Sequence, residues 1–259
     1  MSLQKWLWAV VASGVLAGTA WADPVRTVFT RENKFPGAMK AEIALGGGMA
    51  SYDEDMAGDE VELYDVTPGV RFGLTDRLAV LAEVPYRMLS VGDRDEQGLG
   101  DVALGLEFLF FEDIFEYAWI VPHATAILAT GDEDKGLGTG ESQGRFGISV
   151  GTTVNDVLHF GADVSYTLNG TVSEDDMDER DDLVTGSLSL VFDLDAHASV
   201  LGEVQFRDDP IDSENDYAVR YHLGLAYRIN KNFTLMGYGG GASRMYEDYY
   251  GMGRLVYQF

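Results

Sequence analysis

Leu255-Val256-Tyr257-Gln258-Phe259 ends the chain with alternating apolar and polar side chains and a terminal aromatic ring. Chain ends are usually polar and poorly ordered. The last strand of a membrane β-barrel, in contrast, ends at the lipid interface, where aromatic rings are favoured. This stretch therefore predicts the closing strand of a transmembrane barrel, and a soluble β-protein whose last strand ends in Phe is the alternative.

The other end of the chain has the pattern of a secretory signal peptide. Lys5 supplies a positive charge, residues 6–16 carry none, and Ala20-Trp21-Ala22 offers small residues at both cleavage positions. The apolar run is shorter than the roughly 20 residues that a membrane-spanning helix needs. We therefore expect a signal peptide over 1–22, a periplasmic or lumenal segment over 23–36 and a barrel over 37–259.

Composition narrows the function classes. The 259 residues contain 31 glycines and no cysteine, so thiolate metal clusters, disulfides and cysteine nucleophiles are excluded. The formal net charge of −25 argues against nucleic-acid binding, which requires a basic surface. No residue pattern indicates a cofactor, and none is expected.

Strand-like alternation of period two recurs from residue 38 to the end of the chain. Short turns and longer, acidic connections alternate between the segments, as in bacterial outer-membrane barrels with an even number of strands. The predicted fold is an all-β, twelve-stranded antiparallel transmembrane barrel. Its strands are expected at 38–51, 61–74, 77–90, 99–110, 117–130, 144–154, 157–169, 183–193, 197–207, 217–229, 233–245 and 249–259.

The two faces of these segments differ in polarity. In 157–169, for example, Phe160 and Val164 fall on one face and His159 and Asp163 on the other. An Arg or Lys facing lipid near the membrane midplane costs about 2–4 kcal/mol, so the mid-strand charges are expected to face inward together. They could pair with one another or offer sites to an anion. The candidate lumen residues are Glu42, Asp65, Arg71, Glu83, Arg87, Asp101, Glu107, Arg145, His159, Asp163, Glu203, Arg207, Arg220, His222, Arg228 and Arg254.

The longer connections hold most of the acidic residues. Two short clusters in them, one with Asp53 and Asp55 and one with Asp175 and Asp176, are weak candidates for a divalent cation site that could bridge to lipopolysaccharide. Neither has the full spacing of a calcium loop; after Asp53 and Asp55, for example, Ala57 stands where a third oxygen ligand belongs. Solubility and charge repulsion are the simpler explanation of this acidity.

One stretch supports a family assignment. Gly98-Leu99-Gly100-Asp101-Val102-Ala103-Leu104-Gly105-Leu106-Glu107-Phe108, followed by Thr130-Gly131-Asp132 and Gly136-Leu137-Gly138-Thr139-Gly140, resembles the outer-membrane transporter family of the meta-pathway of phenol degradation. The resemblance implies an outer-membrane barrel that passes hydrophobic or aromatic compounds. For Gly100 and Gly105 a structural role is expected, because a small barrel needs bends and close strand approach.

The leading interpretation is a channel for passive uptake of small solutes. A lipid hydrolase of the outer membrane is one alternative, but it needs a serine and a histidine together at the membrane-facing surface, and the four histidines are expected to face inward. A structural surface barrel with cation-binding acidic loops is another. The expected partners are outer-membrane lipid, lipopolysaccharide, a small-molecule solute, and the barrel assembly machinery through the strand that ends in Phe259.

Overall fold

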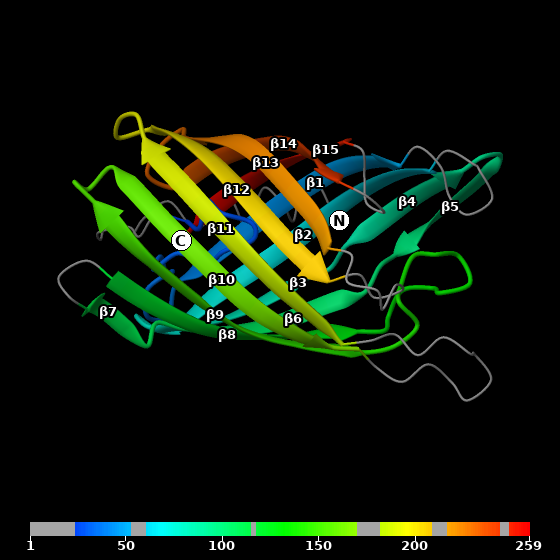
Figure 1. Cartoon of the computed structure of the whole chain (residues 1–259), viewed down its shortest axis with the longest axis horizontal. Helices are drawn as coiled ribbons and strands as arrows, with labels where there is room; N and C mark the ends of the chain where they lie inside the picture. Colours follow the sequence, from blue (N-terminus) through cyan, green and yellow to red (C-terminus); the bar gives the residue numbers. More distant parts are fainter. Residues whose placement is uncertain (1–23, 53–60, 115–117, 170–181, 209–216, 244–248) are drawn as a thin grey trace, which may run out of the picture.

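The computed structural model describes residues 24–52, 61–114, 118–169, 182–208, 217–243 and 249–259. Their strands form one closed antiparallel sheet (Figure 1). The strands are β1 (Ala41–Tyr52), β2 (Val61–Thr75), β3 (Leu78–Glu83), β4 (Tyr86–Val91), β5 (Arg94–Leu99), β6 (Val102–Phe108), β7 (Phe111–Ile114), β8 (Ala118–Leu128), β9 (Gln143–Val154), β10 (Leu158–Leu168), β11 (Leu183–Asp193), β12 (Ala198–Asp208), β13 (Tyr217–Arg228), β14 (Phe233–Ser243) and β15 (Tyr249–Gln258).

The wall has twelve strands because β3 with β4, and β5 with β6, each form one interrupted wall strand, while β7 pairs only with β8. The last strand closes the barrel against the first, with Gln258 opposite Glu42 and Tyr249 opposite Ser51. The predicted twelve-stranded antiparallel barrel is confirmed. Tight turns join strands at the end where the chain terminates, and longer connections lie at the opposite end; we call these the short-turn end and the long-loop end.

The two interrupted strands break side by side. Pro85 separates β3 from β4 and supplies no N–H to the ladder, while the Gly100 nitrogen donates to the Pro85 carbonyl oxygen at 2.8 Å. A Cβ at Gly100 would lie about 3.0–3.1 Å from the Arg87 and Pro85 side chains, so the close approach suits glycine. The expected structural role of this glycine agrees with the geometry.

The prediction of a loop over 91–98 was wrong. Residues 94–99 form β5, which pairs with β4 from Arg94–Val91 to Leu99–Tyr86. Figure 1 shows this hairpin extending beyond the other strands at the long-loop end. Its sequence, Arg94-Asp95-Glu96-Gln97, is polar on both faces, which is why it lacks the alternation of a half-buried strand.

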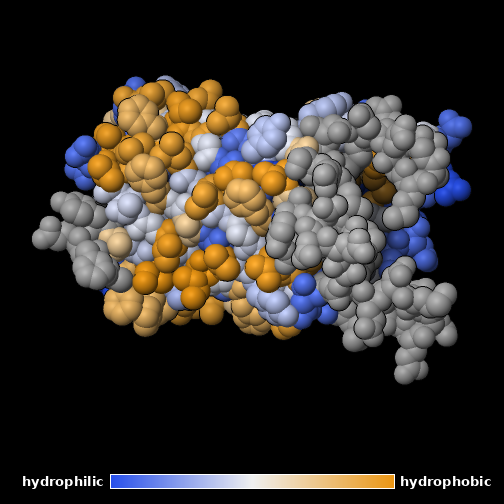
Figure 2. Space-filling view, viewed as in Figure 1, coloured by the Kyte–Doolittle hydropathy of each residue, from blue (hydrophilic) through white to orange (hydrophobic). Residues whose placement is uncertain are grey.

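The outer wall is apolar. Large side chains such as Val164 (64%) on β10 and Leu223 (71%) and Leu225 (62%) on β13 are exposed on the outside, and apolar side chains cover much of the visible wall in Figure 2. The residues between them in sequence, such as His222 (1%) and Asp163 (4%), are buried inside. A contiguous exposed apolar surface of this extent is typical of a membrane-facing wall. Within the described ranges, no helix is long and apolar enough to cross a membrane.

Candidate functional site

Residues 24–36 lie inside the barrel as a loop that enters and leaves at the short-turn end. Pro24 lines a small cavity together with the turn between β11 and β12, and at the other end Ala38 donates its N–H to Asp76 in the turn between β2 and β3. Between these points the segment rises into the lumen and buries Val25, Thr30 and other side chains. We call residues 24–36 the lumenal segment.

Glu203, at the middle of β12, holds the tip of the lumenal segment. Its carboxylate accepts the backbone N–H groups of Val28, Phe29 and Thr30 at 2.6, 3.0 and 3.1 Å. The same carboxylate lies 2.9 Å from Nε2 of His222, whose Nδ1 lies 2.7 Å from the Tyr250 hydroxyl. Three consecutive backbone donors on one charged acceptor form a strong anchor, because hydrogen bonds to charged groups are stronger than neutral ones.

A second anchor joins the base of the lumenal segment to the wall. The Arg26 guanidinium bonds Glu32 within the segment at 2.9 Å, and it also bonds Asp193 on β11 and Ser199 on β12. Burial alone would raise the pKa of Glu32, but the positive charges of Arg26 and Lys34 outweigh it and hold that pKa below 4.5. Glu32 is therefore charged at neutral pH and cross-links the two arms of the loop.

A third anchor involves three of the predicted lumen residues. Arg71 on β2 lies 2.8 Å from Glu107 and 3.4 Å from Glu42, and donates to the Lys34 carbonyl oxygen at 2.6 Å. Glu107 also bonds Arg31 of the lumenal segment at 3.1 Å. The sequence left open whether the inward charges pair with one another or bind an anion; these three charges pair with one another. Removing one partner would leave a buried charge uncompensated.

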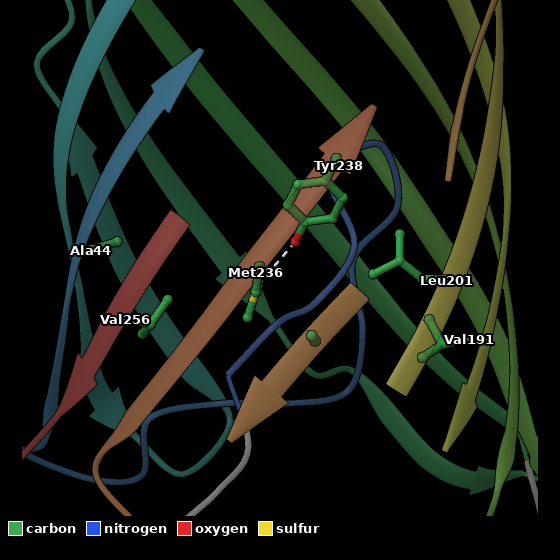
Figure 3. Close-up of a cluster of buried hydrophobic side chains, with 7 residues drawn as sticks. Ala44, Val191, Leu201, Met236, Tyr238 and Val256 are labelled. Atoms are coloured by element: carbon green, nitrogen blue, oxygen red, sulfur yellow. Dashed lines mark hydrogen bonds between the residues drawn. The ribbon is translucent and has the colours of Figure 1, made fainter. Parts of the chain in front are cut away.

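Apolar packing completes the contact between segment and wall. Seven buried side chains from β1 and from β11 to β15 form a cluster inside the barrel, against which Val28 packs: Ala44, Val191, Leu201, Ala226, Met236, Tyr238 and Val256. Figure 3 shows several of them pointing toward the lumenal segment from different strands. Tyr238 also donates its hydroxyl to the Arg26 carbonyl oxygen at 2.5 Å. Phe35 is buried in a second cluster with Ala79, Leu109, Trp119 and Val121.

A cavity of about 360 Å³ remains between the lumenal segment and the wall formed by β1, β2, β3, β6, β8, β9, β14 and β15. Seven predicted lumen residues face it: Glu42, Asp65, Arg71, Glu83, Glu107, Arg145 and Arg254. A second cavity, of about 180 Å³, lies at the short-turn end and is lined by Arg228 and Asp193. Pro24 and no other residue lines both cavities, so this end of the lumenal segment separates them.

Asp101, another predicted lumen residue, does not line the larger cavity and instead binds a connection between two strands. Its carboxylate accepts the N–H groups of Gly131 and Thr139 at 2.9 and 2.7 Å and the Thr139 hydroxyl at 2.8 Å. Arg87 adds a bond to the Leu137 carbonyl oxygen at 3.0 Å. The motif residues around Gly98–Asp101 and 130–140 therefore fasten the connection between β8 and β9 against the break in the wall.

The other predicted lumen residues lie on inward positions of their strands. Asp163 bonds His123 at 2.7 Å and Ser149 at 2.5 Å, and His159 bonds Asp193 at 2.8 Å. The Arg220 guanidinium stacks over Tyr250 and Phe29, 4.6 and 5.6 Å from the ring centroids. Arg207 faces inward near the end of β12, opposite Thr185 and Ala218.

The weak metal candidates Asp53, Asp55, Asp175 and Asp176 lie outside the described residues. Among the residues that the structure describes, no group of three or more His, Asp or Glu side chains could hold a metal ion. The sequence predicted a periplasmic or lumenal segment before the first strand, but it did not predict which wall residues that segment binds. Several of the segment's polar partners, such as Glu203 and Ser149, are more than 100 residues away along the chain.

The family model described as MetA-pathway of phenol degradation matches residues 26–253. The chain belongs to this family. The match includes most of the lumenal segment as well as the wall, and the motif that Asp101 organises lies within it. A search among curated proteins gives no significant match.

Solved structures share the fold. The chain is similar to the COG4313 outer membrane channel from Pseudomonas putida F1, with a TM-score of 0.72 at 13% identity, over 92% of this chain and 99% of that one. It is also similar to the NanC porin, with a TM-score of 0.58 at 10% identity over 84% and 98%. For the KdgM porin the TM-score is 0.55 at 10% identity over 84% and 99%. These similarities establish a barrel of the outer-membrane type.

Proposed function

We propose that this protein is an outer-membrane channel for the passive uptake of small solutes, including hydrophobic or aromatic ones, and that the lumenal segment narrows its pore. The observation that carries the proposal is the cavity of about 360 Å³ between that segment and the wall, which is lined by both charged and apolar residues. Barrels of twelve strands enclose a lumen between the filled eight-stranded type and open porins. The family description, which refers to phenol degradation, supports an aromatic solute.

The route follows the two cavities. A solute entering from the long-loop end reaches the larger cavity, and it then meets the lumenal segment at Pro24 before the smaller cavity at the short-turn end. Passage requires a displacement of residues 24–26, which the bonds of Arg26 to Asp193 and Ser199 hold against the wall. The interior thus works as a narrow, selective path rather than an open pore.

We favour a channel over a lipid hydrolase because of where the histidines point. His123, His159 and His222 face the interior and bond Asp163, Asp193 and Glu203. A hydrolase acting on membrane lipid needs its base beside a serine on the lipid side. The similar solved structures are an outer membrane channel and two porins.

The location and partners follow from the same proposal. Residues 1–22 direct export, the apolar wall contacts outer-membrane lipid and lipopolysaccharide, and the strand ending in Phe259 is recognised by the barrel assembly machinery. The aromatic contacts of Tyr257 with Phe233 and Phe259, with ring centroids 4.7 Å apart in both pairs, support a membrane interface at the short-turn end.

The test is conductance in planar lipid bilayers, comparing the full mature protein with a variant that lacks residues 24–36. We expect small, discrete conductance steps for the full protein and steps several times larger without the lumenal segment. Folding of both proteins is checked by heat-modifiable migration in gels. If neither folded protein conducts, the channel proposal is wrong.

A further inference from the structure

The larger cavity is balanced in charge. Among the described residues, four guanidinium groups and four carboxylates line it: Arg31, Arg71, Arg145, Arg254, Glu42, Asp65, Glu83 and Glu107. Apolar side chains, among them Val28 and Met252, line it as well. A cavity of about 360 Å³ with apolar walls and a few placed polar groups is typical of a small-molecule site. The charges that have no partner within the protein decide what such a site binds.

Half of these charges neutralise one another. Arg71 pairs with Glu42 and Glu107, and Glu107 pairs with Arg31 as well. Because removing one member of a buried pair leaves the other uncompensated, these four groups are committed to holding the lumenal segment. They are not available to a solute.

The other four charges differ in how far they are engaged. Asp65 and Arg145 each bond a threonine hydroxyl, at 2.9 and 3.1 Å. Glu83 and Arg254 make no hydrogen bond and no ion pair within the described part of the chain. One carboxylate and one guanidinium in the same cavity are therefore without a protein partner.

The wall between Glu83 and Arg254 has glycines on its inner face. Glu83 on β3 lies opposite Gly69 on β2, and its side chain lies over that glycine, with Oε1 3.7 Å from the position that a Cβ on Gly69 would take. Arg254 on β15 lies opposite Gly46 on β1. A Cβ at Gly46 would meet no atom closer than 3.5 Å, so packing within the wall does not require glycine there. The absent side chains leave the cavity open between the two charges.

The distance between the two charges suits a bridging molecule. Gly46 pairs with Thr67, which is two residues from Gly69 on β2. Two strand spacings of about 4.8 Å and two residues of about 3.4 Å put the Cα atoms of Arg254 and Gly69 roughly 12 Å apart. The long arginine side chain covers part of this distance. The remainder accommodates a solute that carries an ammonium group and a carboxylate on one carbon atom.

We propose that this part of the cavity binds zwitterionic solutes, namely α-amino acids with an apolar or aromatic side chain. Glu83 accepts hydrogen bonds from the α-ammonium group, and Arg254 donates two parallel hydrogen bonds to the carboxylate. The apolar side chain packs against Val28 and Met252, which lie together at the edge of the apolar cluster. A solute with one charge leaves the other protein group without a partner, which weakens its binding. The inference rests on the proposed channel function and names a solute class for it.

The test is binding of 4-fluorophenylalanine to the detergent-folded protein at pH 6, followed by ¹⁹F NMR line broadening. Two analogues each keep one charge: the N-acetyl derivative keeps the carboxylate, and the carboxamide keeps the α-ammonium group, which is protonated at this pH. We expect the zwitterion to bind at least about tenfold more tightly than either analogue, which corresponds to one charge-assisted hydrogen bond.

Two substitutions assign the two charges. Glu83→Gln should lower the affinity for the zwitterion to about that of the N-acetyl derivative, because only the carboxylate contact remains. Arg254→Gln should lower it to about that of the carboxamide. Asp156→Asn and Arg77→Gln make the same charge changes at exposed turns and should have no effect. Heat-modifiable migration in gels checks that each variant is folded.

Equal binding of the three probes would overturn the inference, as would a preference for the zwitterion that survives Glu83→Gln together with Arg254→Gln in a folded protein. Because this measurement needs no conduction, it is independent of the channel test. A protein that prefers the zwitterion but does not conduct would retain the site and lose the proposed function. A protein that conducts but does not discriminate would do the reverse.

Discussion

The carboxylate of Glu203 lies 2.6 Å from the backbone nitrogen of Val28, which joins the middle of the wall to the tip of the lumenal segment. Three backbone N–H groups depend on this one acceptor, and Glu203 is only 4% exposed. Glu203 therefore fixes how far the segment reaches into the pore.

Replacing Glu203 with Gln should loosen the tip of the lumenal segment. The amide keeps the size but loses the charge, and each hydrogen bond to a charged group is worth about 1.5–3 kcal/mol. Hydrogen exchange at residues 28–30 should become at least about tenfold faster. Ser187→Ala, which removes one hydroxyl bond to the Phe29 carbonyl oxygen at 3.2 Å, should have a smaller effect. Unchanged exchange in the Glu203 variant would show that the apolar contacts alone hold the tip.

Acid should release the base of the segment. The pKa of Glu32 lies below 4.5, because the charges of Arg26 and Lys34 outweigh the effect of burial. A lowered pKa in the folded state means that Glu32 stabilises docking fully above its unfolded pKa, and that this stabilisation is lost as the pH falls through the folded value.

Conductance measured from pH 7 down to pH 3 should therefore rise at the acidic end. Glu32→Gln should conduct more at pH 7 and show a smaller acid-induced rise than the parent protein. Identical pH profiles for the two proteins would rule out Glu32 as the group responsible.

Asp101 should control protease access to the connection between β8 and β9. Its carboxylate binds the N–H groups of Gly131 and Thr139, and Lys135 in the same connection is 46% exposed. In Asp101→Ala, trypsin should cleave after Lys135 several times faster, because the connection loses its anchor. Asp95→Ala removes an acid on the adjacent strand β5 and serves as the control. Equal cleavage rates would mean that the Arg87 bond to Leu137 is sufficient.

A substitution at Leu223 tests whether the outer face of the wall contacts lipid. It lies at the centre of β13 and is 71% exposed. Leu223→Arg should destabilise the barrel by about 2–4 kcal/mol, the cost of Arg near the membrane midplane, measured by denaturant unfolding in lipid vesicles. Ala196→Arg introduces the same charge in the short turn and should cost little. If Leu223→Arg left the free energy of unfolding unchanged, that result would contradict membrane insertion of this face.

The strands of the wall could be predicted from the sequence, but the contacts of the lumenal segment inside it could not. Alternation such as Phe160 and Val164 against His159 and Asp163 fixes two faces wherever one side meets lipid, so the strands could be predicted closely. Residues 24–36 have no such period, because they are irregular backbone bonded to residues far along the chain, as Val28 is to Glu203. Strand β5 was missed for a related reason: its residues 94–97 are polar on both faces, so they show no alternation.

The assignment of Asp101 shows the limit for single residues. Its position in a strand-like segment predicted an inward side chain, but not its partners: the strand is interrupted at this point, and the carboxylate binds the N–H groups of a connection about 30 residues away. Alternation cannot reveal an interruption that depends on two neighbouring strands breaking together. The motif glycines were the available signal, since their spacing reflects the close packing of this connection.

Both ends of the lumenal segment lie at the same rim: Pro24 beside the turn of β11 and β12, and Ala38 at Asp76. The lumenal segment is therefore a loop that enters and leaves at one rim and does not pass through the barrel. The segment can move without a chain end passing along the length of the pore. It can be withdrawn or inserted from one compartment after the wall has sealed. Closure of the wall and docking of the segment rest on different contacts: β1 with β15 for the first, and Glu203, Arg26 and Arg71 for the second.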